Sequence, residues 1–216
     1  MKQIQIDRTE EEREELVKQW ISDNWLTAVI AVLIAIGIVY GFDYYKKSKA
    51  NALNQMAVEV ADVQKAISAN QLEEATKRVS NIQQEASQTA FSSIATLSLA
   101  KRYVDEEKYQ SAIEQYDWLI THADDLAMRD IAKLRKARVQ ANLKQNNQSV
   151  ETLSSLEGKA YITEANLLKG DILLSAKQYE QAQKAYEMLK DNPAINPQIV
   201  QQRLDLLAIK KQQAEK

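Results

Sequence analysis

The segment EKYQSAIEQY (Glu107–Tyr116) decides the fold, because related segments stand at other places in the chain. They are NQLEEATKRV (70–79), KQYEQAQKAY (177–186) and the weaker QNNQSVETL (145–153). A small residue occupies the same slot in all four: Ala75, Ala112, Ser149 and Ala182. A small side chain lets one helix cross another closely, and a large one four residues later, such as Tyr116, fills the groove one turn on. The segments therefore predict a repeated pair of packed helices.

The spacing of these slots indicates a particular architecture. They are 37, 37 and 33 residues apart, close to the period of about 34 residues in tetratricopeptide repeats. The helix before each of the last three segments carries its own small residue, at Ala100, Ala137 and Gly170. An ordinary helical bundle with alanine seams is the alternative, but a regular small–large register favours a solenoid of stacked helix pairs.

Polar clusters divide the chain after Asn51 into seven or eight expected helices of about 10 to 20 residues. The expected breaks are SANQ (68–71), DEEK (105–108), THADD (121–125), KQNNQ (144–148), EGK (157–159), SAKQ (175–178) and KDNP (190–193). The helix after Pro197 is expected to cap the open end of the solenoid through Ile199, Leu204, Leu207 and Ala208. With only four Gly and two Pro, the composition favours helix throughout.

One apolar stretch, NWLTAVIAVLIAIGIVYGFDYYKK (24–47), differs from the rest of the chain. It contains 19 uncharged residues between Asp23 and Asp43, and such a helix is roughly 28 Å long, about the thickness of a bilayer's hydrocarbon core. Aromatic residues stand at both margins, as at membrane interfaces: Trp20, Trp25, Tyr40, Phe42, Tyr44 and Tyr45. A cleaved signal peptide would have a basic start and a shorter apolar run. A soluble core helix would need apolar partner helices. We therefore predict a retained transmembrane anchor.

The predicted fold class is all-α, with one N-terminal transmembrane helix (24–45) followed by a tetratricopeptide-repeat-like α-solenoid (46–216). The acidic segment 1–23 precedes the membrane helix. Its run DRTEEEREE (7–15) is interpreted as a solvated helix start, capped by Asp7 or Thr9.

Composition and motifs disfavour several function classes. The formal charge of −2 provides no basic stripe for nucleic acid, and the absence of Cys excludes disulfides and thiol catalysis. His122 is the single histidine; beside Asp124 and Asp125 it lacks the further groups of a metal or acid–base site. No nucleotide-binding glycine loop or hydrolase motif occurs. We expect no catalytic residue, no metal, no cofactor and no enzymatic activity.

The segment TEEEREELVKQWISDN (9–24), ahead of a single span, resembles the start of the ancillary subunits of the bacterial SecYEG translocon. That family opens with a Thr-acid-Glu-Glu run and has Lys, Trp and Asn just before the membrane. Two later segments, AKLRKARV (132–139) and LLKGDILL (167–174), resemble the repeat helices of the same family.

The resemblance implies a non-enzymatic adaptor in the cell inner membrane, single-pass and type II, with 1–23 in the cytoplasm and 46–216 in the periplasm. It also implies three kinds of partner: the SecYEG translocon, a membrane-anchored periplasmic chaperone of the prolyl-isomerase type, and exported client proteins. Charge does not decide the orientation, because three basic residues flank each side of the span. A repeat scaffold or signalling regulator facing the cytoplasm is therefore the alternative.

Five residues are candidates for partner contacts. Gly37 and Gly41 form a G-x-x-x-G pair, which leaves a notch where another membrane helix can pack closely. Lys101, Arg138 and Asp171 each follow a small slot by one residue. In repeats of this kind the first helix of each pair lines the concave face, so these side chains are expected there.

Overall fold

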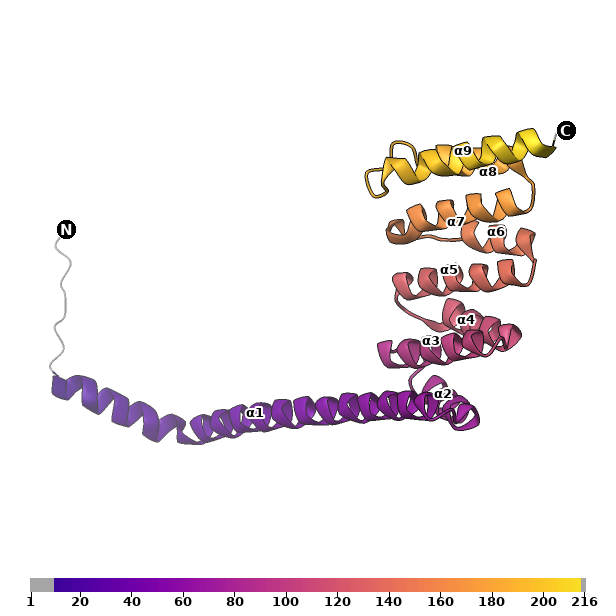
Figure 1. Ribbon diagram of the computed structural model, residues 1–216. Coiled ribbons are helices and arrows are strands. Elements are labelled where there is room, and N and C mark those ends of the chain that lie inside the picture. The colour runs from indigo at the N-terminus through magenta and orange to yellow at the C-terminus, as the bar shows by residue number, and fades with distance from the viewer. Residues whose placement is uncertain (1–9, 215–216) are drawn as a thin grey trace, which may run out of the picture. The chain divides into compact units, whose positions relative to one another are not determined.

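The computed structural model describes residues 10–214, with the side chains of 10–12 and of Ala28 left aside. Figure 1 shows that this range is built from helices and contains no strand. The helices are α1 (Glu10–Ser68), α2 (Leu72–Glu85), α3 (Ala90–Asp105), α4 (Tyr109–His122), α5 (Leu126–Asn142), α6 (Asn146–Ser154), η1 (Lys159–Tyr161), α7 (Ile162–Ser175), α8 (Tyr179–Glu187) and α9 (Pro197–Ala214). The prediction of an all-α chain is confirmed.

Helix α1 carries the apolar stretch and continues into the repeats without a break. One compact unit of the chain ends at Gln55, and a second covers Met56–Lys216. The sequence-based boundaries of the membrane helix, between residues 23 and 24 and between 45 and 46, both lie inside the continuous helix α1. They therefore stay predictions. The expected helix cap at Asp7 or Thr9 lies outside the described residues.

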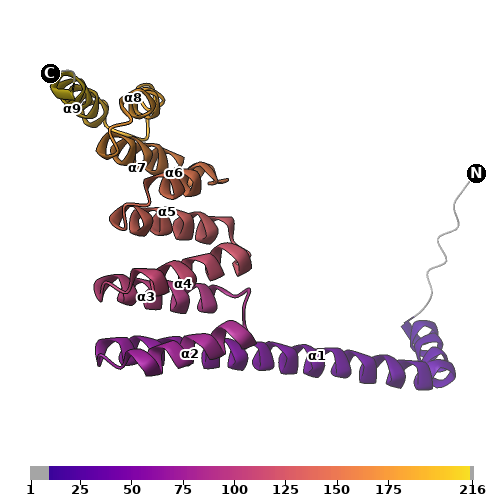
Figure 2. The ribbon, with the colours of Figure 1, turned by 90° about the vertical axis from the view of Figure 1, so that its right-hand side faces the viewer.

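In the second unit the helices form successive antiparallel pairs (Figures 1 and 2). The end of α1 pairs with α2, α3 with α4, α5 with α6, and α7 with α8, and α9 follows as a single helix. The four small slots of the second helices are all completely buried, at 0% exposure: Ala75, Ala112, Ser149 and Ala182. The slots of the first helices stand twelve residues earlier and are buried too: Val63, Ala100, Ala137 and Gly170. Both slots hold a small residue in the last three pairs, whereas the first pair has Val63 in the slot of α1.

Ser149 explains how the weakest repeat keeps this register. Its hydroxyl donates a hydrogen bond of 2.6 Å to the backbone carbonyl of Ala137, at the small slot of the facing helix. A buried hydroxyl is costly unless it is bonded. The bond lets a serine occupy the position that the other pairs give to alanine.

The turn inside each pair has one backbone conformation. Its second residue lies in the left-handed region in all four pairs: Asn70 (φ 59°), Glu107 (φ 57°), Lys144 (φ 63°) and Lys177 (φ 60°). The next residue donates back to the last turn of the first helix, for example Lys108 N–H to the Tyr103 carbonyl at 2.8 Å. This Schellman geometry usually takes glycine. Here it stops the first helix without one and sets the same reversal in each pair.

The core runs along the stack as three overlapping groups of buried apolar residues. The first joins the end of α1 to α5, the second joins α5 to α7, and the third joins α7 to α9. Helix α9 buries Val200 and Leu207, whereas Ile199 remains 38% exposed. Each pair of helices is therefore stabilised by its neighbours, as in other solenoids.

The clearest differences between the helix boundaries and the sequence-based expectation lie before α3 and at the start of α6. A break at Ala86–Thr89 separates α2 from α3, where no break was expected. Thr89 produces it by capping α3, since its hydroxyl accepts a 3.2 Å bond from Ser92 N–H. Helix α6 begins at Asn146, inside the expected KQNNQ break.

Candidate functional site

The first helices of the pairs stack on one another along the second unit (Figures 1 and 2). A buried residue marks the same position in α3, α5, α7 and the single helix α9: Ala95, Ala132, Ala165 and Val200. Three residues later come Ser98, Arg135, Leu168 and Arg203. Ser98 and Arg203 each contact the residue that follows the slot of the preceding first helix, and the register puts Arg135 and Leu168 at the equivalent positions. The stack thus aligns pairs of residues across each junction.

We call these pairs the rungs of the first-helix face: Gln64–Ser98, Lys101–Arg135, Arg138–Leu168 and Asp171–Arg203. Two rungs are direct contacts. The Gln64 amide donates to the Ser98 hydroxyl at 2.6 Å, and Arg203 Nε donates to Asp171 Oδ1 at 2.8 Å. The first and last rungs are therefore direct contacts. The two rungs between them, Lys101–Arg135 and Arg138–Leu168, are assigned from the repeat register.

The structure places Lys101, Arg138 and Asp171 on this face, in different surroundings. Lys101 is exposed and forms no ion pair with the described residues. Arg138 is exposed too, and its guanidinium pairs with Glu164 in the first turn of α7. Asp171 is half-buried. Of the three, Lys101 is the one whose charge is free of an ion pair within the described part of the chain.

Asp171 anchors the last pair of helices. Its Oδ1 accepts a 2.7 Å bond from the Tyr186 hydroxyl in addition to the bond from Arg203. Burial raises the pKa of Tyr186, and the hydrogen bond to the Asp171 carboxylate raises it further, because both disfavour the phenolate. Gly170 makes room for the ring, since a Cβ there would lie 2.3 Å from Tyr186 Cε1. Asp171 Oδ2 forms no hydrogen bond with the described residues.

Gly37 and Gly41 lie on the apolar part of α1. A Cβ added at either glycine would meet no atom within 4 Å, so the notch is open. Within the described residues, Val29–Ser68 is the one helical stretch long and apolar enough to cross a membrane, and none of its apolar window is buried. The large apolar side chains on both sides of the notch, such as Ile34 and Ile38, are more than half exposed. The apolar window of this stretch is therefore unpartnered in the described residues, whereas the end of the stretch, around Val63, packs against α2.

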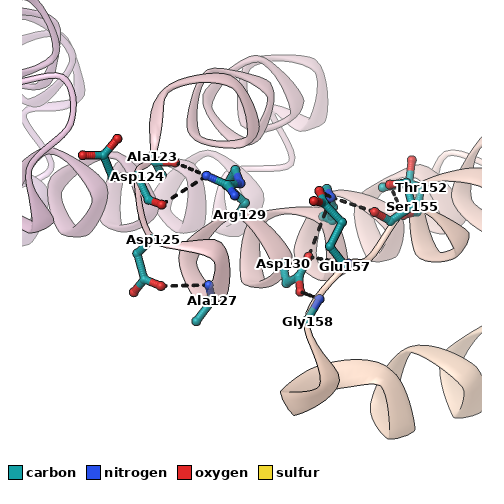
Figure 3. Close-up of polar contacts among 11 residues, drawn as sticks. Ala123, Asp124, Asp125, Ala127, Arg129, Asp130, Thr152, Ser155, Glu157 and Gly158 are labelled. Carbon is teal, nitrogen blue, oxygen red and sulfur yellow. Dashed lines mark hydrogen bonds and ion pairs between the residues drawn. The ribbon is translucent and has the colours of Figure 1, made fainter.

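A buried polar cluster around Asp130 was not anticipated from the sequence (Figure 3). Asp130 is 0% exposed. Its carboxylate accepts from the backbone N–H of Gly158 at 2.7 Å and from that of Glu157 at 3.2 Å. The neighbouring Lys133 donates to the Ser155 carbonyl at 2.7 Å and pairs with Glu157 at 2.9 Å. The cluster fastens the linker between α6 and α7 to α5, which is a structural task.

The described residues offer little for catalysis. His122 stacks on Trp118 with ring centroids 4.7 Å apart, and its Nδ1 lies 2.9 Å from the Trp118 carbonyl oxygen. No group of three or more His, Cys, Asp or Glu side chains in residues 10–214 is placed to hold a metal ion. An open hollow of about 930 Å³ lies at the α1–α2 turn. Several of its charges are paired with each other, as Arg78 is with Glu74 at 2.7 Å and Lys65 with Asp62 at 2.9 Å.

Comparison with known proteins gives one family and several relatives. Residues 18–209 match the family model described as a tetratricopeptide repeat-like domain. Three similar proteins are each named "Ancillary SecYEG translocon subunit". The one from Aggregatibacter actinomycetemcomitans is 28% identical over 92% of this chain and 98% of its own length. The one from Haemophilus influenzae is 26% identical over 85% and 94%, and the one from Escherichia coli is 23% identical over 85% and 88%. No solved structure matches the chain significantly.

Proposed function

Because the chain belongs to the tetratricopeptide repeat-like domain family, we propose that it is a non-enzymatic, membrane-anchored adaptor associated with the Sec translocon. Repeat solenoids use their extended surfaces to bind other proteins. The relatives that align over most of the chain carry the translocon in their name. Their similarity over nearly their whole length supports the same association for this protein.

The observation that carries the proposal is the composition of α1. It joins a fully unburied apolar stretch to the first repeat within one helix. An apolar face of this size in water would be an aggregation liability, but in a bilayer it is an anchor. The anchor confines the repeat surface to the membrane, where a translocon subunit works.

In the finer proposal the protein lies in the cell inner membrane as a single-pass, type II protein, with 1–23 in the cytoplasm and 46–216 in the periplasm. There the repeats link the translocon to a membrane-anchored chaperone of the prolyl-isomerase type and receive exported client proteins. This step rests on the resemblance of the N-terminal segment, while the names of the relatives support the association with the translocon.

Two surfaces are proposed for partner contacts. The Gly37–Gly41 notch packs against a membrane helix of the translocon or of the chaperone, since close backbone approach drives helix association in lipid. Lys101, Arg138 and Asp171 contribute to binding on the first-helix face. Asp171 keeps Oδ2 for a partner while Oδ1 holds Tyr186 and Arg203.

The orientation separates this proposal from a scaffold or regulator that faces the cytoplasm. The test is a C-terminal fusion to alkaline phosphatase, which is active only outside the cytoplasm, made in parallel with a fusion to green fluorescent protein. The proposal requires phosphatase activity and little fluorescence. The reverse pattern would establish the cytoplasmic alternative.

A further inference from the structure

Helix α9 stands at the end of the stack, and no further helix pair follows it in the described residues (Figures 1 and 2). Its Val200 marks the same position as Ala95, Ala132 and Ala165 in the earlier first helices. The register therefore identifies the face of α9 that a next pair would cover. In repeat proteins the outer face of a terminal repeat is normally polar, because it meets water.

In each earlier first helix, two apolar positions come two and nine residues after this mark. None of the residues there is exposed: Leu97, Val104, Leu134, Ala141, Leu167 and Leu174. Leu167 and Leu174 pack in the same apolar group as Leu207 of α9. Between these two lies the rung residue of α7, Asp171, which bonds to Arg203 of α9. In α7 this face therefore contacts the helix that follows in the stack.

The same face of α9 is apolar and uncovered. Leu206 stands at the rung position, and Ile209 stands at the position of Leu174. Leu206, Ile209 and Ile199, which lies seven residues before Leu206, are 41%, 53% and 38% exposed. Helix α9 thus packs on the preceding pair with one face and presents a second apolar face to a further helix.

This second face has the spacing of a coiled-coil seam. Its residues follow one another at alternating intervals of three and four, the a/d pattern of a two-stranded coil: Ile199, Gln202, Leu206, Ile209 and Gln213. Asp205 and Lys210 then occupy flanking g and e positions, and such residues form ion pairs between parallel helices. Neither of them has an ion pair with the described residues. Two parallel copies of α9 would therefore form two Asp205–Lys210 pairs beside an apolar seam.

The other end of the stack does not fit this apolar face. Asp62 of the first pair stands at the position of Lys136 and Lys169, each of which bonds to the preceding pair. With no pair before it in the described residues, Asp62 pairs with Lys65 at 2.9 Å and with Arg78 at 3.7 Å. An apolar surface packed there would remove these charges from water at a cost. A closed, two-fold contact between two α9 faces is therefore favoured over a head-to-tail chain of copies.

We propose that α9 is a self-association surface through which two copies of this chain pack as a parallel helix pair. Ile199, Leu206 and Ile209 form the seam, and Asp205 of each copy pairs with Lys210 of the other. Two heptads alone associate weakly, but anchoring both copies in one membrane raises the effective concentration of each surface for the other. The inference goes beyond the proposed adaptor function and rests on it only for the membrane anchor.

The first test uses the absence of cysteine from the chain, so that one introduced cysteine reports its own neighbour. In a parallel pair each seam residue faces its counterpart. Gln202→Cys in the full-length protein should therefore form a disulfide between copies when membranes are oxidised, giving a product of twice 24.5 kDa on non-reducing gels. Gln201→Cys is the matched control, because Gln201 is also exposed but lies off the seam.

Gln202→Cys should give severalfold more dimer than Gln201→Cys, since a disulfide needs Cα atoms within about 7 Å of each other. Equal dimer at both positions, as in a dimer held by the membrane spans alone, would overturn the proposal. Monomer at both positions would overturn it too.

The second test reads the register of the helix pair in the Gln202→Cys protein. Asp205→Lys and Lys210→Asp each bring like charges together at both flanks, so each should lower the dimer yield about threefold or more. The double variant Asp205→Lys/Lys210→Asp exchanges the partners and should restore the yield. Single variants without effect, or a double variant as weak as the singles, would overturn the parallel pair. Because the cross-link joins copies of this chain, its loss leaves the Sec association to its own test.

Discussion

Gly170 of α7 lies against the ring of Tyr186 of α8, so closely that a Cβ at Gly170 would lie 2.3 Å from Cε1 of the tyrosine. Tyr186 is 0% exposed and its hydroxyl is held by Asp171, so the ring has no free space to move into. The glycine at this slot is therefore required by packing, whereas Ala100 and Ala137 occupy the same slot in the two preceding pairs.

Gly170→Ala should destabilise the protein by about 1–3 kcal/mol, the usual cost of overpacking a core. Chemical denaturation of the purified protein followed by circular dichroism measures it. In the double variant Gly170→Ala/Tyr186→Leu, the smaller side chain, as at Leu153, relieves the clash. The two changes should then be less than additive. Strict additivity would mean that the two residues do not press on each other.

Lys144→Gly should stabilise the protein by about 0.5–1 kcal/mol. A residue other than glycine pays a steric cost at φ 63°, and glycine removes it despite its greater freedom in the unfolded chain. Gln145→Gly is the control: Gln145 has φ −83°, so glycine gains nothing there and should destabilise. The two unfolding midpoints, compared by urea titration, should move in opposite directions. A lower midpoint for Lys144→Gly would refute the assigned turn.

Stability should fall in acid partly through Glu157. The ammonium of Lys133 holds the pKa of the Glu157 carboxyl below its ordinary value of 4.5. A carboxyl group whose pKa is lowered by folding stabilises the folded protein at pH values above its ordinary pKa. This contribution is lost as the pH falls through 4.5 toward the lowered pKa. The melting temperature of Glu157→Gln should therefore fall less between about pH 5 and pH 3 than that of the unmodified protein. Glu151→Gln, at an exposed glutamate without an ion pair in the described residues, should behave like the unmodified protein. Identical acid profiles for Glu157→Gln and the unmodified protein would argue against the pair.

The repeat architecture was predictable because its signal is steric. Ala75, Ala112 and Ala182 repeat a small residue at a fixed place, and the structure buries each completely. Ser149 replaces the alanine of the other pairs but keeps the same buried position, because its hydroxyl donates a hydrogen bond to the Ala137 carbonyl. The turn conformations were not predictable, because Glu107, Lys144 and Lys177 adopt positive φ without the glycine that normally indicates it.

The polar parts of the surface were harder to anticipate. Lys101 and Arg138 were identified by register alone, but the partner of Arg138 depends on the next first helix, where it meets Glu164. Asp130 is an acidic residue among charged neighbours in the sequence, and its role arises only when the α6–α7 linker folds back over it.

Replacing Gly37 and Gly41 together with isoleucine should leave membrane insertion unchanged and reduce recovery of the membrane partner from detergent. Isoleucine fills the open notch and prevents the close backbone approach on which helix association in lipid depends. Carbonate extraction of the membranes checks insertion, and quantitative blotting of the partner checks association. The matched control replaces Ala31 and Ala35 with isoleucine; each stands six residues before one of the glycines and therefore on a different face of the helix. Equal recovery from the glycine variant and the unmodified protein would make the span a tether only.

The most direct measurement of the central claim is the amount of SecYEG that co-purifies with the tagged, full-length protein from inner membranes in mild detergent. Two altered chains serve for comparison. In one, residues 24–45 are replaced by an unrelated membrane helix; the other lacks residues 46–216. We expect much more SecYEG to co-purify with the full-length protein than with an unrelated membrane protein that carries the same tag. Each of the two altered chains should recover less SecYEG than the full-length protein. Recovery no greater than with that unrelated protein would contradict the proposed association with the translocon.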